Sequence, residues 1–433
     1  MTNIPDDIIA KLFLLEHPSV HVPEMFKQIY GTIAAHAKTT DVPWGMVLPE
    51  RLAEKFNKDL EIFNDMIRNL RNTSPYLLDV FIPTEEYLFK PGSLFQPAKI
   101  DPVLFEQYSH EDTTKIVSGF EPDSDGFALV PRYSRASSAT GRLVVEHGPN
   151  ILNLKKQHRN MIVSRWGAHG AIIGLDYQAL EPSMLVCLNK SSLFSHPHVS
   201  PTLSEQEREK KSMGYTSRIL REGIYSNSTD PYIEILARTG LVQDDASIPE
   251  LRDVMKSITV SRMNGMQTSG LIAKINETFQ LTHGITAAKL VEIVDDVLCL
   301  DDIQKKLYSE WTGKNSCSFV ENYYGRPILC DSDNLLINRY FQSSAVDLAM
   351  SGFKNVVSYI QDDIPDTEEF LTNIAVPLYL LHDMIVFDVN TGPGSSGLTT
   401  INSLAKIGSR DLPGFEDGSF KLRQTPFIHI PKQ

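Results

Sequence analysis

The sequence predicts an α+β protein in which two strand-rich regions flank a helical insertion. Strand-like apolar runs occupy residues 127–185 and 317–390, and apolar residues recur at helical spacing through much of 200–310. A long amphipathic pattern over 48–72 precedes all three regions. At 433 residues the chain is long enough to form two or three domains.

The first hundred residues are expected to be mainly helical at their start and irregular at their end. Residues 1–40 form a short helical lead, and 48–72 form one helix with Pro49 near its start, where a missing N–H costs nothing. Residues 72–110 are rich in Pro and turn formers. Within them, the run YLLDVFI at 76–82 resembles a short strand.

Beyond residue 127 the predicted elements alternate between strands and long helices. Strands are expected in FALVPRYSR, GRLVVE, NMIVSRW, AIIGLDYQAL and SFVENYYGRPILC. Helices are expected over 248–264, ended by Gly265, over 285–311, and over 335–360. The segment VPLYLLHDMIVFDV has two strand-like runs that meet at His382 and Asp383, which predicts a hairpin.

Composition argues against a membrane span and a disulfide framework. No apolar run approaches the roughly 18–20 residues of a span, and the four cysteines are scattered without C-x-x-C spacing. The N-terminus carries acids ahead of a short apolar patch, unlike a secretory signal. We therefore expect a cytoplasmic protein without a membrane partner, located in the host cytoplasm if the gene is viral.

The net charge of −13 is unfavourable for nucleic-acid binding when the chain is taken as a whole. Local fields decide such binding, however, and basic residues cluster at Leu154–Arg159 and Glu207–Gly223. Taken alone, each cluster is typical of a solvated helix face.

Two aspartates occupy equivalent positions at the ends of strand-like runs. Asp176 ends one run, and Asp383 lies at the turn of the predicted hairpin. If these strands are neighbours in one sheet, both carboxylates project from the same edge and suit Mg²⁺, which binds one or two carboxylates plus substrate phosphates. Two such ions, about 3.5–4 Å apart, would clamp an in-line phosphoryl displacement. On these two residues alone, turn or capping acids are the favoured interpretation.

The helix predicted at 248–264 carries functional side chains on one face. Arg252, Lys256, Val260 and Asn264 recur every four residues. A guanidinium and an ammonium one turn apart suit a triphosphate, because Arg binds bidentately and Lys places a point charge or donates a proton. An exposed basic stripe is the simpler alternative.

Six segments, in order, resemble the polymerase core of family-A DNA polymerases, the bacterial DNA polymerase I and phage replicative class. LDYQALEPS is similar to the family's DYSQIELR, and LLHDMIVFDV is similar to VHDEVVFEV. The other four segments are ATGRLVVEHGPNILNL, RDVMKSITVSRMNGM, FVENYYGRPI and INRYFQSSAVDLA. The resemblance covers 139–389 and implies a right-hand fold with an antiparallel-sheet palm, a helical fingers insertion and a short helical thumb.

The expected domain limits follow from this resemblance. They are a helical lead at 1–40, a thumb-like region at 41–126, a first palm part at 127–190, fingers at 191–316, and a second palm part with a C-terminal extension at 317–433. A proofreading exonuclease needs a domain-sized segment of its own. Too few residues precede the thumb-like helix to form one, so we expect no exonuclease in this chain. A separate exonuclease or processivity factor would then be a partner, and a phage replication gene is favoured.

The resemblance also implies catalytic roles. Asp176 and Asp383 would bind two Mg²⁺ ions, or Mn²⁺ in their place, and Tyr177 would offer its main-chain carbonyl to a metal. Arg252 and Lys256 would hold the incoming dNTP, with Lys256 as the general acid.

The remaining implied roles concern the sugar, the template and the primer. Glu181 would exclude a ribose 2′-OH, while Val260 and Asn264 stand where the family has aromatic residues beside the nucleotide and template. Met384 replaces the acid that follows the second catalytic aspartate. The expected contacts to primer–template DNA are His382, Arg142, Asn338 and Gln342.

The expected activity is template-directed addition of dNTPs to a primer 3′-OH with release of pyrophosphate. Two alternatives stay open: an enzyme like the single-subunit RNA polymerases, and a catalytically weak protein that only binds primer–template junctions.

Overall fold

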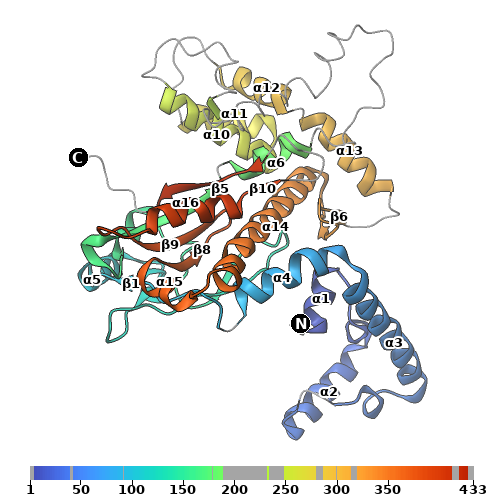
Figure 1. The fold of residues 1–433 in the computed structure, drawn as a ribbon. Coiled ribbons are helices and arrows are strands. Elements are labelled where there is room, and N and C mark those ends of the chain that lie inside the picture. The colour runs from blue at the N-terminus through green and yellow to red at the C-terminus, as the bar shows by residue number, and fades with distance from the viewer. Residues whose placement is uncertain are drawn as a thin grey trace. The chain divides into compact units, whose positions relative to one another are not determined.

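The computed structural model describes most of the chain in ten segments (Figure 1). These are residues 4–39, 42–90, 92–177, 179–188, 232–233, 248–278, 286–298, 300–313, 319–411 and 419–427. The basic stretch predicted at 207–223 and about half of the 191–316 region lie outside them. The chain divides into two compact units, Met1–Pro83 with Tyr324–Pro327, and Thr84–Tyr323 with Ile328–Gln433.

The first unit is helical, as the sequence predicts. It contains α1 (Asp6–Leu12), η1 (Pro18–His21), α2 (Glu24–Ala37), η2 (Trp44–Met46), α3 (Glu50–Thr73) and η3 (Tyr76–Phe81). The long amphipathic helix is confirmed as α3, which begins immediately after Pro49 and buries Phe56, Phe63 and Ile67.

The strand predicted at 76–82 is wrong, because η3 is a π-helical turn. Its buried residues are Tyr76, Leu77, Val80 and Phe81, a spacing that places them on one side of a helix. Packing of this apolar side therefore overrides the strand propensity of the aromatic and β-branched residues.

The second unit is built on a four-stranded antiparallel sheet in the order β12-β5-β9-β8. Its strands are β5 (Gly170–Tyr177), β8 (Ala375–Leu380), β9 (Met384–Asn390) and β12 (Leu422–Pro426). The predicted hairpin is confirmed by the pairing of β8 with β9. β12 is an edge strand with alternating exposure that carries Arg423 and Gln424, and no strand was predicted there.

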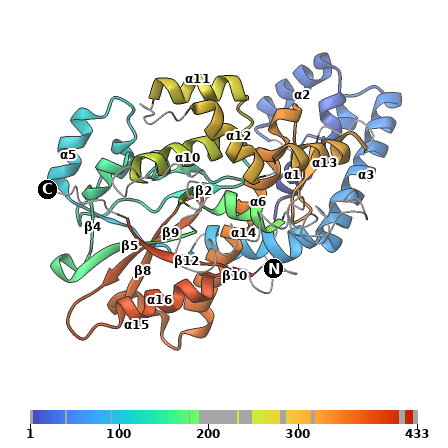
Figure 2. The ribbon, with the colours of Figure 1, turned by 90° about the horizontal axis from the view of Figure 1, so that it is seen from above.

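Helices cover one face of this sheet, and loops with short elements cover the other (Figure 2). On the first face, α14 (Leu336–Ser358) packs against α16 (Gly397–Gly408), which contacts β9 and β12. On the second face, Ile172 and Val386 join a core with Ile100 and Ile162. The shorter elements around this core are β1 (Lys99–Ile100), α5 (Pro102–Glu111), η5 (Val117–Phe120), η6 (Lys156–Met161) and β4 (Ile162–Val163).

The helical insertion follows α6 (Leu180–Leu188). Within it, the structure describes residues 232–233 and most residues from 248 onward. It contains α10 (Ile248–Met263), α11 (Thr268–Thr278), α12 (Ala287–Leu298) and α13 (Leu300–Gly313). Gly265 follows α10 with a φ of 80°, so the predicted end of this helix is confirmed. The single helix predicted over 285–311 is instead two helices, α12 and α13.

The remaining elements are α4 (Ile82–Thr84), η4 (Glu85–Phe89), β2 (Arg132–Ser134), β3 (Val144–His147), η7 (Gly167–His169), β6 (Phe319–Glu321), β7 (Pro327–Leu329), η8 (Asp333–Leu335), η9 (Tyr359–Asp363), α15 (Thr367–Asn373), β10 (Arg410–Asp411) and β11 (Ser419–Phe420). In the part of the chain that the structure describes, no helix is long and apolar enough to cross a membrane.

Candidate active site

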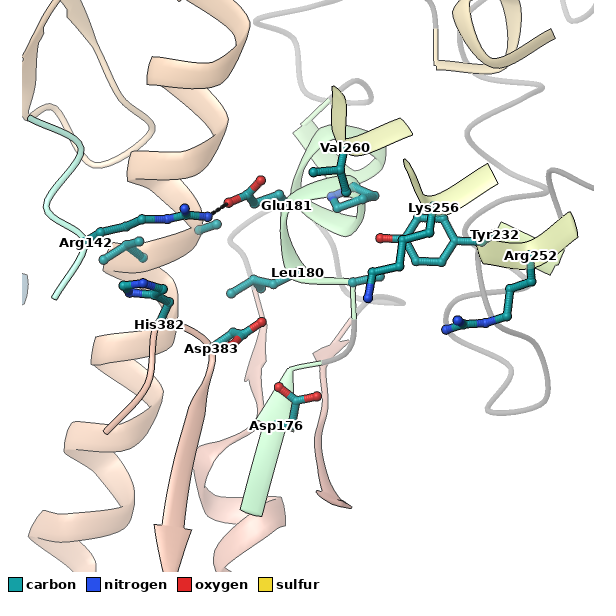
Figure 3. A pocket seen from close by; sticks show the side chains of 14 residues that line it. Arg142, Asp176, Leu180, Glu181, Tyr232, Arg252, Lys256, Val260, His382 and Asp383 are labelled. Atoms are coloured by element: carbon teal, nitrogen blue, oxygen red, sulfur yellow. Dashed lines mark hydrogen bonds and ion pairs between the residues drawn. The ribbon is translucent and has the colours of Figure 1, made fainter. Parts of the chain in front are cut away.

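The sheet brings the two predicted carboxylates together. Asp176 pairs in register with Met384, the residue after Asp383. The main-chain N–H of Tyr177 donates to the carbonyl of Asp383 over 2.9 Å. Both aspartates line one cavity of about 380 Å³ (Figure 3). The condition on which the metal-site hypothesis depended, adjacency of these two strand ends, is therefore met.

Alternation along β5 turns Tyr177 away from this cavity. Its side chain lies on the α14 side of the sheet, where its ring centroid is 5.7 Å from that of Phe353 and its hydroxyl donates to the Gly408 carbonyl. Asp176, one residue earlier, projects from the opposite face. The resemblance implies only that the main-chain carbonyl of Tyr177 binds a metal. The position of the Tyr177 side chain is compatible with that role.

Burial and mutual repulsion make both carboxylates costly to ionise. Burial, followed by the charge of Asp383, raises the pKa of Asp176 to about 7, while Lys256 and Lys156 oppose the shift. Burial, followed by Glu181, raises the pKa of Asp383. A cation bound between them would relieve both effects.

The donor set fits a hard divalent cation that takes further ligands from a substrate. Among the described residues, no group of three or more His, Cys, Asp or Glu side chains could hold a metal ion. Two carboxylates are nevertheless sufficient for Mg²⁺, which keeps waters and takes phosphate oxygens as additional ligands.

The predicted basic face of α10 forms the wall of the cavity opposite the aspartates. Arg252, Lys256 and Val260 line this wall, and Lys256 extends toward the carboxylates (Figure 3). The guanidinium carbon of Arg252 lies 5.7 Å from the centroid of Tyr232, an aromatic residue of the cavity that the sequence analysis missed. Negative and positive side chains thus face each other across one space.

Glu181 reaches the cavity from the start of α6. Ala179, with a left-handed φ of 49°, lies in the turn between β5 and this helix. Arg142 Nη2 donates to Glu181 Oε1 over 2.7 Å. The Gln342 amide lies 2.8 Å from Thr140 Oγ1 and, with its oxygen turned toward Arg142, 3.0 Å from Nη2. Three predicted site residues therefore form one polar cluster.

His382 also lines the cavity. Burial and the nearby charge of Arg142 lower the pKa of His382 to about 4, so its imidazole is neutral at pH 7.

Four predicted residues do not line the cavity: Tyr177, Gln342, Asn264 and Asn338. Asn264 and Asn338 instead hydrogen-bond to each other through their amides. Beside them, Gln267 Nε2 donates to Asn334 Oδ1 over 2.8 Å. These contacts join the end of α10 to the start of α14.

Two further cations lie near the carboxylates. Lys156 lowers the pKa of Asp176, and Asp383 raises the pKa of Arg159, although burial has the larger, opposite effect on that guanidinium. The basic stretch 154–159 was the available signal, but a solvated helix face was the favoured interpretation.

No protein-family model matches the chain, and no curated protein matches it. Among solved structures, it is similar to the polymerase domain of Pol1 from M. smegmatis, solved in complex with DNA primer-template and dNTP. The TM-score is 0.54 with 13% sequence identity, over 86% of this chain and 73% of that one. The resemblance predicted from the sequence is thus confirmed for the fold, which is that of a DNA polymerase I polymerase domain.

Proposed function

We propose that this protein is a template-directed DNA polymerase that adds dNTPs to a primer 3′-OH and releases pyrophosphate. The observation that carries the proposal is the cavity in which Asp176 and Asp383 face Arg252 and Lys256. Two carboxylates opposite two cationic side chains suit the transfer of a phosphoryl group from one oxygen to another. The fold likeness to a polymerase domain supports the same chemistry.

Asp176 and Asp383, with the carbonyl of Tyr177, would hold two Mg²⁺ ions, or Mn²⁺. When bound, such ions supply Lewis-acid stabilisation of the charge that develops on the phosphoryl oxygens. Arg252 binds the triphosphate bidentately. The primer 3′-hydroxyl gives its proton to solvent, and its oxygen forms a bond to the α-phosphorus as the bond to the bridging oxygen breaks. The Lys256 ammonium gives a proton to that leaving oxygen.

Other residues in and near the cavity select the nucleotide and position the DNA. Glu181, held by Arg142, opposes a ribose 2′-OH, and Val260 borders the nucleotide sugar. Asn264 lies on the template side. Arg142, Asn338, Gln342 and His382 contact the primer–template near the growing pair.

In domain terms, residues 127–190 and 317–433 form the palm, 191–316 the fingers and 41–126 the thumb, after a helical lead at 1–40. The antiparallel sheet that carries both aspartates supports the palm assignment, and α10–α13 support the fingers assignment.

The test is primer extension with dNTPs or rNTPs, with Mg²⁺, with Mn²⁺, and with a chelator. We expect extension with dNTPs that requires the metal. The double variant Asp176→Ala with Asp383→Ala should lose extension but retain most primer–template affinity. Preferred use of rNTPs would favour the RNA polymerase alternative. Binding without any extension by the unmutated protein would overturn the proposal in favour of a binding protein.

A further inference from the structure

The helix η6 presents two cations on one face. A 3₁₀ helix has about three residues per turn, so side chains at i and i+3 eclipse. Lys156 and Arg159 therefore share a face, while His158 and Met161 share another that is buried. The His158 ring stacks on Tyr108 with centroids 4.6 Å apart. The buried face thus holds the cationic face in a defined orientation.

Arg159 is held in place without using its hydrogen-bonding capacity. Its guanidinium carbon lies 4.8 Å from the ring centroid of Phe427, the residue that follows β12. Its Nε is buried and has no hydrogen-bond partner among the described residues. Stacking on an aromatic face fixes the guanidinium plane, and since Nε is buried, the terminal amino groups are the donors that a ligand can reach.

The two cations interact electrostatically with the carboxylates but do not line the cavity. Electrostatic interaction links Lys156 to Asp176 and Arg159 to Asp383. Neither cation is among the residues that line the cavity, whereas Arg252 and Lys256 are. A ligand of η6 is therefore a different group from the triphosphate bound along α10.

We propose that Lys156 and Arg159 form a phosphodiester-binding face that holds the primer backbone next to its 3′ end. The proposal rests on the proposed function. When the primer 3′-oxygen lies at the carboxylates, the nearest phosphodiester of the primer is about one nucleotide away. The negative charge of this phosphodiester then needs a cation outside the cavity. Arginine suits this ligand because its planar donor edge matches phosphate oxygens.

The experiment pairs protein variants with a neutral-backbone primer. Arg159→Gln, Lys156→Gln and Phe427→Leu are compared with the unmutated protein on primer–templates with or without methylphosphonate at the two 3′-terminal primer linkages. Lys155→Gln is the matched control, since Lys155 is exposed and lines a different hollow with Asp112 and Thr114. Arg159→Lys tests rescue, and thermal unfolding checks that each variant folds.

We expect Arg159→Gln to weaken primer–template binding about tenfold without changing KM for dNTP, and to flatten the dependence of binding on salt by about one phosphate contact. Methylphosphonate should weaken binding by the unmutated protein to a similar extent and have no further effect on Arg159→Gln. The proposal would be overturned if the losses of binding affinity caused by Arg159→Gln and by methylphosphonate were strictly additive. A higher KM for dNTP with unchanged DNA affinity would also overturn it.

The readouts separate the two proposals. Unchanged primer–template affinity in Arg159→Gln, in a protein that extends primers, would refute the phosphodiester face and leave the polymerase proposal intact. A methylphosphonate effect that depends on Arg159, in a protein that extends no primer, would support the face and refute the polymerase.

Discussion

The main-chain N–H of Tyr177 lies 2.9 Å from the carbonyl oxygen of Asp383, and this hydrogen bond closes the end of the β5–β9 ladder. It joins the two segments at the point where each carries its acid. Because side chains alternate along a strand, this bond directs Asp176 to the cavity face and the Tyr177 ring to the helical face.

Neutralising one acid of the site should stabilise the protein while it abolishes activity. Both carboxylates are desolvated and repel each other, so at pH 8 without metal we expect Asp176→Asn to raise the free energy of unfolding by about 1–2 kcal/mol. Chemical denaturation in a chelator measures this, with the exposed Asp362→Asn as the control. A clear loss of stability would show that Asp176 contributes to the fold through contacts other than charge.

The two cations of α10 should affect different kinetic parameters. Arg252→Gln should raise KM for dNTP, because it removes binding to the triphosphate. Lys256→Met should mainly lower kcat, by about 10²–10⁴-fold, because it removes a proton donor. Single-turnover extension measures both, with the exposed Lys274→Gln of α11 as the control. If Lys256→Met, like Arg252→Gln, raised only KM for dNTP and left kcat unchanged, Lys256 would not be the general acid.

Sugar selection should depend on the Arg142–Glu181 pair as a unit. Glu181→Ala removes the side chain that opposes a 2′-OH, and Arg142→Gln removes the donor that holds it 2.7 Å away. We expect both to reduce the ratio of kcat/KM for dNTP over rNTP, with a double variant that is less than additive. Arg132→Gln, from an exposed pair with Glu146, is the control. Unchanged selectivity in Glu181→Ala would remove it from this role.

A buried ion pair should be essential to the folding of the second unit. Arg135 and Asp347 pair with side chains 1% and 0% exposed, and Asn322 Nδ2 donates to Asp347 over 2.6 Å. Asp347→Asn removes the charge of the carboxylate that pairs with the buried Arg135 guanidinium, so we expect a loss of about 3–5 kcal/mol in unfolding free energy. The exposed pair Asp65–Arg68 is the control, and Asp65→Asn should change stability by less than about 0.5 kcal/mol. Equal effects of the two variants would contradict this role.

Stability should fall as pH rises because of Glu85. Burial raises the pKa of Glu85 from 4.5 to about 7, Arg135 opposes the shift and Glu146 adds to it. The folded state therefore holds a proton that the unfolded state loses above pH 4.5, so the unfolding free energy declines between about pH 4.5 and 7 and is level above. Glu85 is only half-buried, and solvent screens part of this effect. We therefore expect Glu85→Gln to raise the unfolding free energy by about 1 kcal/mol at pH 8 and to leave it unchanged at pH 4. Equal gains at both pH values would point to packing instead.

The amino-acid sequence by itself determined the local elements and the order of the motifs. The amphipathic period of α3, the end of α10 at Gly265 and the hairpin of β8 and β9 depend on neighbouring residues, whose spacing and turn chemistry are readable along the chain. The four-residue repeat that begins at Arg252 likewise places side chains on one helical face without reference to any other segment.

Only the tertiary structure decided which distant segments meet. Asp176 and Asp383 are more than two hundred positions apart, and their adjacency results from strand pairing, which no local pattern encodes. The same holds for β12 on the edge of the sheet, for Arg142 beside Glu181, and for Arg159 over Phe427. Periodicity reports which side of an element is buried, whereas a site depends on what packs against that side, and this is settled by the burial of the whole chain.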